Sequence, residues 1–105
     1  MKFKTGQGSL SQYLKLPTNC IVKKPDNIST EEAAGVTCAG ITAYQTLMTE
    51  GNFKEGQSVF VIGGSSSLGA YVIQMAKSMG ASRIGASASG KNEDAVRKLG
   101  ADDVS

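Results

Sequence analysis

The chain contains no histidine among its 105 residues. A Ser-His-Asp or Cys-His nucleophile system therefore cannot be assembled from this sequence, because the base that activates the nucleophile is missing. Zinc sites of mixed cysteine and histidine type are excluded for the same reason, and the two cysteines, Cys20 and Cys38, are too few for a four-cysteine site. Acid–base chemistry would have to use tyrosine, lysine, aspartate or glutamate.

The sequence also has little net charge and no long apolar run. Its formal charge of +2 is scattered, without a dense basic stretch or interleaved aromatic residues, so no nucleic-acid partner is expected. No run approaches the length of a membrane span, and residues 1–5 lead into no signal-peptide-like apolar stretch. The cysteines form no CxxC pair and suit a reducing compartment, where we expect them as small buried hydrophobic residues. These features predict a cytoplasmic protein without a membrane partner.

The first half of the chain predicts two extended runs and then helices. Alternating apolar residues indicate a strand over 9–16, and a second short extended run is expected over 20–22. Ser29 and Glu32 have the spacing of a capping box, so a helix should begin there. Glycine and two β-branched residues at 35–37 predict an interruption of that helix.

A second helical run is expected after the interruption. The residues that share one of its faces are Gly40, Ala43, Tyr44, Leu47 and Met48, and Gly51 is placed to end it. On this pattern alone, Thr42 and Tyr44 are interpreted as packing residues.

The second half of the chain alternates strands and helices. An unbroken apolar strand over 58–62, typical of a parallel strand covered on both faces, is followed by a turn rich in glycine and serine. The elements expected after it are a helix over 68–79 with a buried stripe of Leu68, Val72, Ile73, Ala76 and Met79, a strand over 83–87, a helix capped by Asn92 and running to Leu99, and a third strand from about 101. This order predicts the α/β class, as the opening of a doubly wound parallel sheet of the Rossmann-like kind.

The turn between the first of these strands and the helix that follows it contains a candidate binding motif. Set against the dinucleotide-binding pattern GxGxxG, it gives Gly64, Ser66 and Gly69, so the middle glycine is replaced. Gly63 and Gly64 permit a tight exit from the strand, and Gly69 permits close packing of the helix. The helix then presents free N–H groups to a pyrophosphate, and the hydroxyls of Ser65, Ser66 and Ser67 add donors. The alternative is an ordinary turn built from small residues.

The choice of cofactor depends on the end of the next strand. An acidic residue about 20 residues after the glycines would bind the ribose 2′-hydroxyl of NAD. The segment between Ser82 and Asn92 has none and offers instead Ser87, Ser89 and Lys91, which suit a 2′-phosphate. NADPH is therefore favoured over NADH, the alternative being a polar loop before a helix.

Several separate motifs, in order along essentially the whole chain, resemble the zinc-independent quinone-oxidoreductase and enoyl-reductase branch of the medium-chain dehydrogenase/reductase superfamily. They lie at 8–13, 22–29, 31–35, 40–44 (Gly-Ile-Thr-Ala-Tyr), 56–59 and 99–102 (Leu-Gly-Ala-Asp). The resemblance implies hydride transfer from NADPH to a small molecule, namely a quinone, an enone or enal, or a similar activated carbonyl compound. It also implies that no zinc is required.

The resemblance further implies which residues contact the cofactor. In such enzymes the helix carrying Thr42 lies beside the nicotinamide. The pyrophosphate turn corresponds to Gly64, Ser65, Ser66, Ser67, Leu68 and Gly69, and the adenosine-phosphate region corresponds to Ser87, Ser89 and Lys91. Members of the family usually have glycines where Ser66 and Ser67 stand, so this chain departs from the pattern there. No catalytic residue is assigned.

The resemblance divides the chain into two parts. Residues 1–57 correspond to the closing segment of a GroES-like catalytic domain with its linking helices, and residues 58–105 to the first half of an NAD(P)-binding Rossmann domain. The usual dimerisation edge falls outside both. We therefore expect a fragment of an oxidoreductase. The alternatives are a truncated, non-catalytic polypeptide with at most weak nucleotide binding, and a small module that pairs through exposed strand edges.

Overall fold

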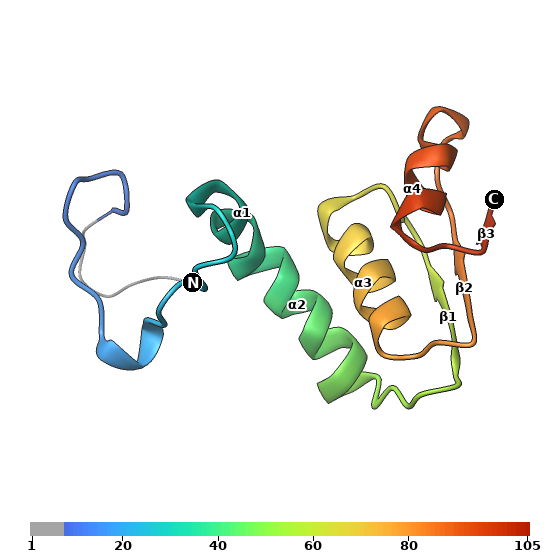
Figure 1. Ribbon diagram of the computed structural model, residues 1–105, viewed down its shortest axis with the longest axis horizontal. Helices are drawn as coiled ribbons and strands as arrows, with labels where there is room; N and C mark the ends of the chain where they lie inside the picture. The colour runs from blue at the N-terminus through green and yellow to red at the C-terminus, as the bar shows by residue number, and fades with distance from the viewer. Residues whose placement is uncertain (1–7) are drawn as a thin grey trace.

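The computed structural model describes residues 8–105 (Figure 1). A stretch with little regular structure leads into one long helix, and a small α/β unit follows it. The elements, in order, are a 3₁₀ turn Thr18–Cys20, α1 Thr30–Gly35, a π-helical turn Val36–Gly40, α2 Ile41–Tyr44, a second π-helical turn Gln45–Glu50, β1 Ser58–Val61, α3 Ser67–Ser78, β2 Arg83–Ala86, a 3₁₀ turn Gly90–Asn92, α4 Glu93–Leu99 and β3 Asp103–Val104.

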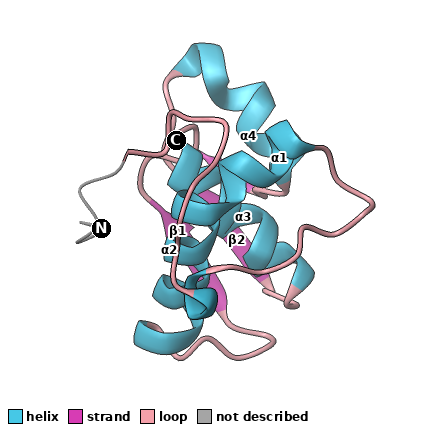
Figure 2. Cartoon of the chain, turned by 90° about the vertical axis from the view of Figure 1, so that its left-hand side faces the viewer, coloured by secondary structure: helices cyan, strands magenta, loops and turns pink. Residues whose placement is uncertain are grey.

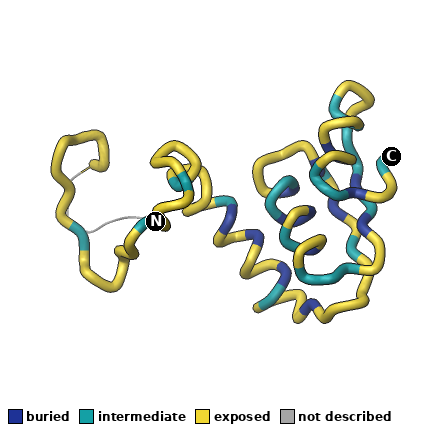
Figure 3. Tube along the Cα trace, viewed as in Figure 1, coloured by how far each residue is buried: buried dark blue, intermediate teal, exposed yellow. Residues whose placement is uncertain are grey.

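The two extended runs predicted near the N-terminus are not strands. Within residues 8–29 the only regular element is the short turn Thr18–Cys20, and most residues around it are exposed, although Leu16 is half-buried (Figure 3). Leu10 is fully exposed and Val22 is 90% exposed. A strand persists only where a neighbouring strand takes up its backbone hydrogen bonds, and the described part of the chain offers none to this segment. The prediction of strands over 9–16 and 20–22 was wrong.

The capping box that starts the long helix is confirmed. The Glu32 N–H donates to the Ser29 hydroxyl at 3.1 Å, and the Ser29 N–H donates to the Glu32 carboxylate at 2.9 Å. The interruption predicted at 35–37 takes a milder form, because hydrogen bonding changes from α to π at Val36 and the helix continues to Glu50. The Gly51 N–H then closes it on the Thr46 carbonyl at 2.9 Å.

One face of the long helix packs on α3, and three of the five residues predicted to share a face are buried there. Gly40, Ala43 and Leu47 are buried and Met48 is half-buried. Tyr44 is 51% exposed, so its assignment to the buried face was wrong. A Cβ at Gly40 would lie 3.1 Å from the Val36 Cγ1 of the preceding helical turn, and the Tyr71 ring of α3 would lie at an ordinary contact distance of 3.8 Å. In the turned view of Figure 2 this helix stands in front of the strands.

The sheet is parallel throughout, in the order β1-β2-β3, so the predicted α/β class is confirmed. Val59 pairs with Ile84, and Gly85 pairs with Asp103. The face that carries Ile84 and Ala86 is covered, because Ile73 of α3 and Val96 of α4 pack against it in the core.

The opposite face of the sheet is open within residues 8–105. Phe60 is 62% exposed and lies over Gly85, where a Cβ would come within 2.7 Å of its ring. Ile62 is 87% exposed. The prediction that the strand over 58–62 is covered on both faces was therefore wrong for the described part of the chain.

The remaining elements follow the sequence with small corrections. The buried stripe of α3 uses Gly69 in place of Leu68, which is 39% exposed. α4 begins where expected, but the Asn92 side chain does not cap it and donates instead to the Ser89 hydroxyl at 3.1 Å. Gly100, at φ +124°, ends it as predicted.

Both cysteines are exposed free thiols, so the expectation that they are buried was wrong. No helix in residues 8–105 combines the length and the apolar character needed to cross a membrane.

Candidate functional site

The turn that joins β1 to α3 lies at the carboxyl edge of the parallel sheet, and its glycines set its shape. Gly63 has φ +79°, a conformation that other residues adopt only under strain. Gly64 is buried, and a Cβ there would come within 2.9 Å of the Ala86 Cβ and within 3.1 Å of the Ile73 side chain. The turn is thus seated directly on β2 and α3, as the tight exit predicted from the sequence requires.

Gly69 brings the first turn of α3 onto the same backbone. A Cβ on Gly69 would collide with the Gly63 carbonyl oxygen and come within 2.9 Å of the Gly64 Cα. Only glycine lets the helix begin so close to the strand exit. The close packing that the sequence assigned to Gly69 is present.

The hydroxyl of Ser66 is turned back onto the turn. Ser66 is the N-cap of α3, and its oxygen accepts a hydrogen bond from the Gly69 N–H at 3.0 Å. The same hydroxyl donates to the Gly63 carbonyl at 2.7 Å. The side chain that replaces the expected middle glycine therefore bonds to the protein's own backbone.

The first N–H groups of α3 are left available. Ser65, Ser67 and Leu68 are exposed, and within residues 8–105 the N–H groups of Ser67 and Leu68 find no acceptor. Unpaired N–H groups and the helix dipole make the start of a helix a favourable place for an anion. This backbone can therefore hold a phosphate.

The residues that follow β2 lie at the same edge. The Ser87 hydroxyl accepts a hydrogen bond from the Gly63 N–H at 3.0 Å, and its carbonyl accepts one from Gly64 at 2.9 Å. The Ser89 hydroxyl accepts a hydrogen bond from the side-chain amide of Asn92. Lys91 is exposed, and its amine makes no ion pair or hydrogen bond within the described residues. The structure thus ties Ser87 to the turn and leaves Lys91 free to reach a ligand.

Thr42 lies on the long helix, apart from the turn. It is exposed, and its hydroxyl donates to the Cys38 carbonyl at 2.8 Å. One helical turn further on, Thr46 donates to the Thr42 carbonyl at 2.8 Å. Thr46 also lines a groove of about 260 Å³ beside β1, whose other wall includes Ser66 and Leu68. Thr46 was not predicted from the sequence, although its four-residue spacing from Thr42 places both on one helix face.

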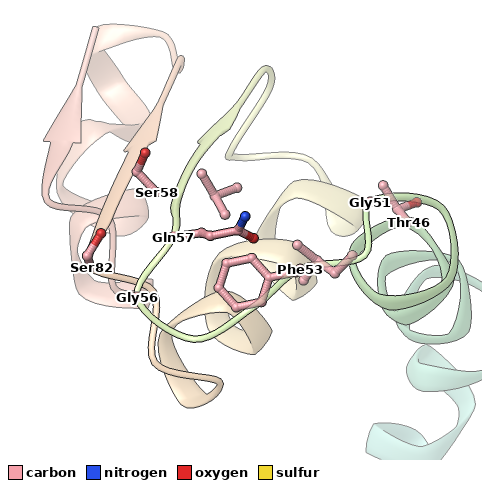
Figure 4. A pocket seen from close by; sticks show the side chains of 9 residues that line it. Thr46, Gly51, Phe53, Gly56, Gln57, Ser58 and Ser82 are labelled. Atoms are coloured by element: carbon pink, nitrogen blue, oxygen red, sulfur yellow. The ribbon is translucent and has the colours of Figure 1, made fainter.

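A larger hollow, of about 580 Å³, lies away from the turn (Figure 4). It sits between the end of the long helix and the amino ends of β1 and β2, with Phe53, Gln57 and Ser82 among its lining residues. No charged side chain lines it. Ligands of open parallel sheets bind outside the carboxyl ends of the strands, so this hollow is not the candidate site.

An ion pair joins two neighbouring strands of the α/β unit. Arg83 of β2 donates a hydrogen bond to the Asp103 carboxylate of β3 at 2.6 Å. This hydrogen bond, with the charge of Arg83, holds the pKa of Asp103 below its ordinary value, and it raises the pKa of Arg83. Residues 8–105 contain no cluster of three or more potential metal ligands from histidine, cysteine, aspartate and glutamate.

A parallel sheet with a turn shaped by glycines between its first strand and the following helix defines a partial Rossmann-like fold. A protein from Solanum lycopersicum named 2-methylene-furan-3-one reductase is 40% identical over 96 residues, which cover 90% of this chain and 24% of that protein. The NADPH-dependent alkenal/one oxidoreductase, chloroplastic, from Arabidopsis thaliana is also 40% identical over 96 residues, covering 90% of this chain and 25% of that protein.

A solved structure of a mycobacterial protein complexed with NADPH superposes with a TM-score of 0.78 at 27% identity, covering 86% of this chain and 27% of that one. No family model matches the chain. By its relatives and structural neighbours, the chain belongs to the medium-chain dehydrogenase/reductase family. It spans about a quarter of the length of the curated relatives it matches.

Proposed function

We propose that this chain provides the pyrophosphate-binding part of an NADPH-dependent oxidoreductase that reduces a quinone, an enone or enal, or a similar activated carbonyl compound. One observation carries the proposal: at the carboxyl edge of the sheet, the N–H groups of Ser67 and Leu68 find no acceptor within residues 8–105. The two relatives named for NADPH-dependent alkenal/one reduction and for furanone reduction support the cofactor and the substrate class.

The residues at this edge fit the proposed cofactor. The N–H groups of Ser67 and Leu68 would hold the pyrophosphate, with the exposed hydroxyls of Ser65 and Ser67 beside them. Gly64 and Gly69 let the backbone approach it closely, because neither position has room for a side chain.

Two segments that flank the turn would contact the two ends of the cofactor. Lys91 and Ser89 would meet the 2′-phosphate, which favours NADPH over NADH. The Ser87 hydroxyl proton has no acceptor in the described part of the chain and can point to the same phosphate. Thr42 would contact the nicotinamide, from which bound NADPH supplies the hydride.

The same proposal covers the domains, the metal and the compartment. Residues 1–57 would close a GroES-like catalytic domain, and residues 58–105 would open the cofactor domain. We propose reduction without zinc, and a reducing compartment such as the cytoplasm, in keeping with two exposed free thiols.

A second candidate function is nucleotide binding by this chain without turnover. The open sheet face around Phe60 and Ile62 favours it, because a dinucleotide site is usually closed by elements on both sides of the sheet. NADPH bound with no reduction of an enal would distinguish this function from the first.

The Ser67→Pro variant tests the proposed function by removing one N–H. Proline is well tolerated at the first position of a helix, and the extended conformation of Ser66 (φ −73°, ψ 160°) suits a residue before proline. Loss of one hydrogen bond to a charged group should weaken NADPH binding about tenfold. The measurement is the dissociation constant from an NMR titration.

The matched control is Ser67→Ala, which keeps the N–H and removes only the hydroxyl. Because that hydroxyl would lie beside the pyrophosphate, Ser67→Ala should weaken NADPH binding somewhat, but less than Ser67→Pro does. Equal binding by the wild-type chain and Ser67→Pro, with the fold intact by circular dichroism, would mean that the phosphates do not bind at this helix.

A further inference from the structure

Two serine hydroxyls hold the backbone of Gly63 from both sides. The Gly63 N–H donates to the Ser87 hydroxyl at 3.0 Å. The Gly63 carbonyl accepts from the Ser66 hydroxyl at 2.7 Å and from the Ser66 N–H at 3.0 Å. Both hydrogen-bonding groups of this glycine are therefore engaged by serines, one after β2 and one at the start of α3.

A turn of this composition needs such contacts to keep one shape. The residues 63–67 are two glycines and three serines, and Gly63 stands at φ +79°. Glycine loses more conformational freedom on ordering than any other residue, so a glycine-rich turn is intrinsically mobile. A binding turn that must first become ordered loses affinity, whereas one that is already ordered does not.

The Ser66 hydroxyl bonds to the backbone of the turn and of the helix that follows it. Ser66 bonds to Gly63 and to the N–H of Gly69, which is buried, while Ser67 and Leu68 are exposed. The hydroxyl of Ser66 is thus occupied at the backbone, and the N–H groups proposed to meet the phosphates remain available.

We propose that Ser66 and Ser87 are positioning residues that hold the phosphate-binding turn in its binding conformation before the cofactor arrives. This inference rests on the proposed function and revises the role expected for Ser66, which would act through Gly63 and Gly69. The hydroxyl of Ser66 performs the task that a glycine at this position cannot, because glycine has no group to bridge the turn.

The test uses the 105-residue chain with the variants Ser66→Ala, Ser66→Thr, Ser87→Ala and Ser65→Ala. The first readout is amide hydrogen exchange at Gly63 and Gly69 without cofactor. Exchange should accelerate at Gly69 in Ser66→Ala and at Gly63 in Ser87→Ala, because each variant removes the acceptor of that N–H. Ser65→Ala is the matched control, since the Ser65 hydroxyl forms no hydrogen bond within the described residues.

The second readout is the NADPH dissociation constant from the same samples. Ser66→Ala should weaken binding about fivefold, within the range expected for loss of a cap. Ser66→Thr keeps the hydroxyl and should restore both readouts, which also separates the effect from a general loss of folding. Ser65→Ala should leave Gly63 and Gly69 exchange unchanged.

The outcomes separate this inference from the proposed function. Faster exchange in Ser66→Ala with unchanged NADPH affinity would overturn the positioning role alone. A wild-type chain whose Ser67 and Leu68 amides do not respond to NADPH would overturn the proposed function, and the inference with it.

Discussion

Gly69 faces the carbonyl oxygen of Gly63 so closely that the first turn of α3 has no room for a side chain there. This contact joins a strand exit to the helix that follows it, and both of its sides are backbone. Backbone cannot move aside as the end of a flexible side chain can, so the contact fixes where the free N–H groups of α3 stand.

The Gly69→Ala variant should therefore lower the free energy of unfolding by about 3 kcal/mol, at the upper end of the cost of overpacking. Thermal or urea unfolding followed by circular dichroism measures the change. Gly90→Ala is the matched control, because a Cβ there meets nothing within 4 Å. It should be neutral or stabilise by about 0.5 kcal/mol through the unfolded chain. Equal stability of the two variants would show that the helix starts elsewhere.

The exposure of Cys20 and Cys38 predicts that both thiols react in the folded protein. Titration with a disulfide reagent such as DTNB under native conditions should release two equivalents, the full cysteine content. Cys20→Ser should leave one equivalent. A thiol that reacts only after a denaturant is added would mean that its segment packs as the sequence had suggested.

The Arg83–Asp103 pair predicts a pH dependence of stability. The pKa of Asp103 is held below its ordinary value of 3.8 in the folded chain, chiefly by the hydrogen bond from Arg83. The carboxylate therefore stabilises the fold above that value, and the contribution is lost as the pH falls through 3.8 towards the lowered pKa. Both side chains are largely exposed, so salt should weaken the effect.

Melting temperatures between pH 7 and pH 2 measure this dependence. Asp103→Asn should flatten the acidic part of the curve. Asp26→Asn should not, because Asp26 pairs with Lys23 at 3.8 Å and both side chains are almost fully exposed. If melting temperature depended on pH in the same way in the wild type and in Asp103→Asn, the ion pair would not contribute to stability.

The free amine of Lys91 predicts the choice between the two cofactors. Lys91→Gln should weaken NADPH binding about threefold, the scale of an exposed ion pair, and leave NADH binding unchanged. Lys98→Gln, an exposed lysine in the last turn of α4, is the control and should change neither. If Lys91→Gln lost equal affinity for NADPH and for NADH, Lys91 would not contact the 2′-phosphate.

The sequence predicted best where structure depends on neighbours in the chain. The capping box of Ser29 and Glu32, the glycine that ends α4 at Gly100 and the order of strands and helices after Ser58 all follow from local spacing. The packing of Gly64 and Gly69 could also be anticipated, because a strand that leads at once into a helix leaves little room.

The sequence was a poor guide to strands and burial that depend on partners distant in the chain. The alternating residues of 9–16 suit a strand, but no other strand pairs with them in residues 8–105. Phe60 and Ile62 suit a buried strand, yet only one face of the sheet is covered in the described part. The hydrogen bond from the Gly63 N–H to the Ser87 hydroxyl joins residues 24 apart, and no local sequence pattern predicts it.

The most direct test of the account is an ¹H–¹⁵N NMR titration of the wild-type chain with NADPH. We expect the largest shifts at the amides of Ser67 and Leu68, smaller shifts after β2 near Lys91, and weaker shifts when NADH is added. Shifts confined to the hollow near Phe53, or no shifts at millimolar NADPH, would contradict it.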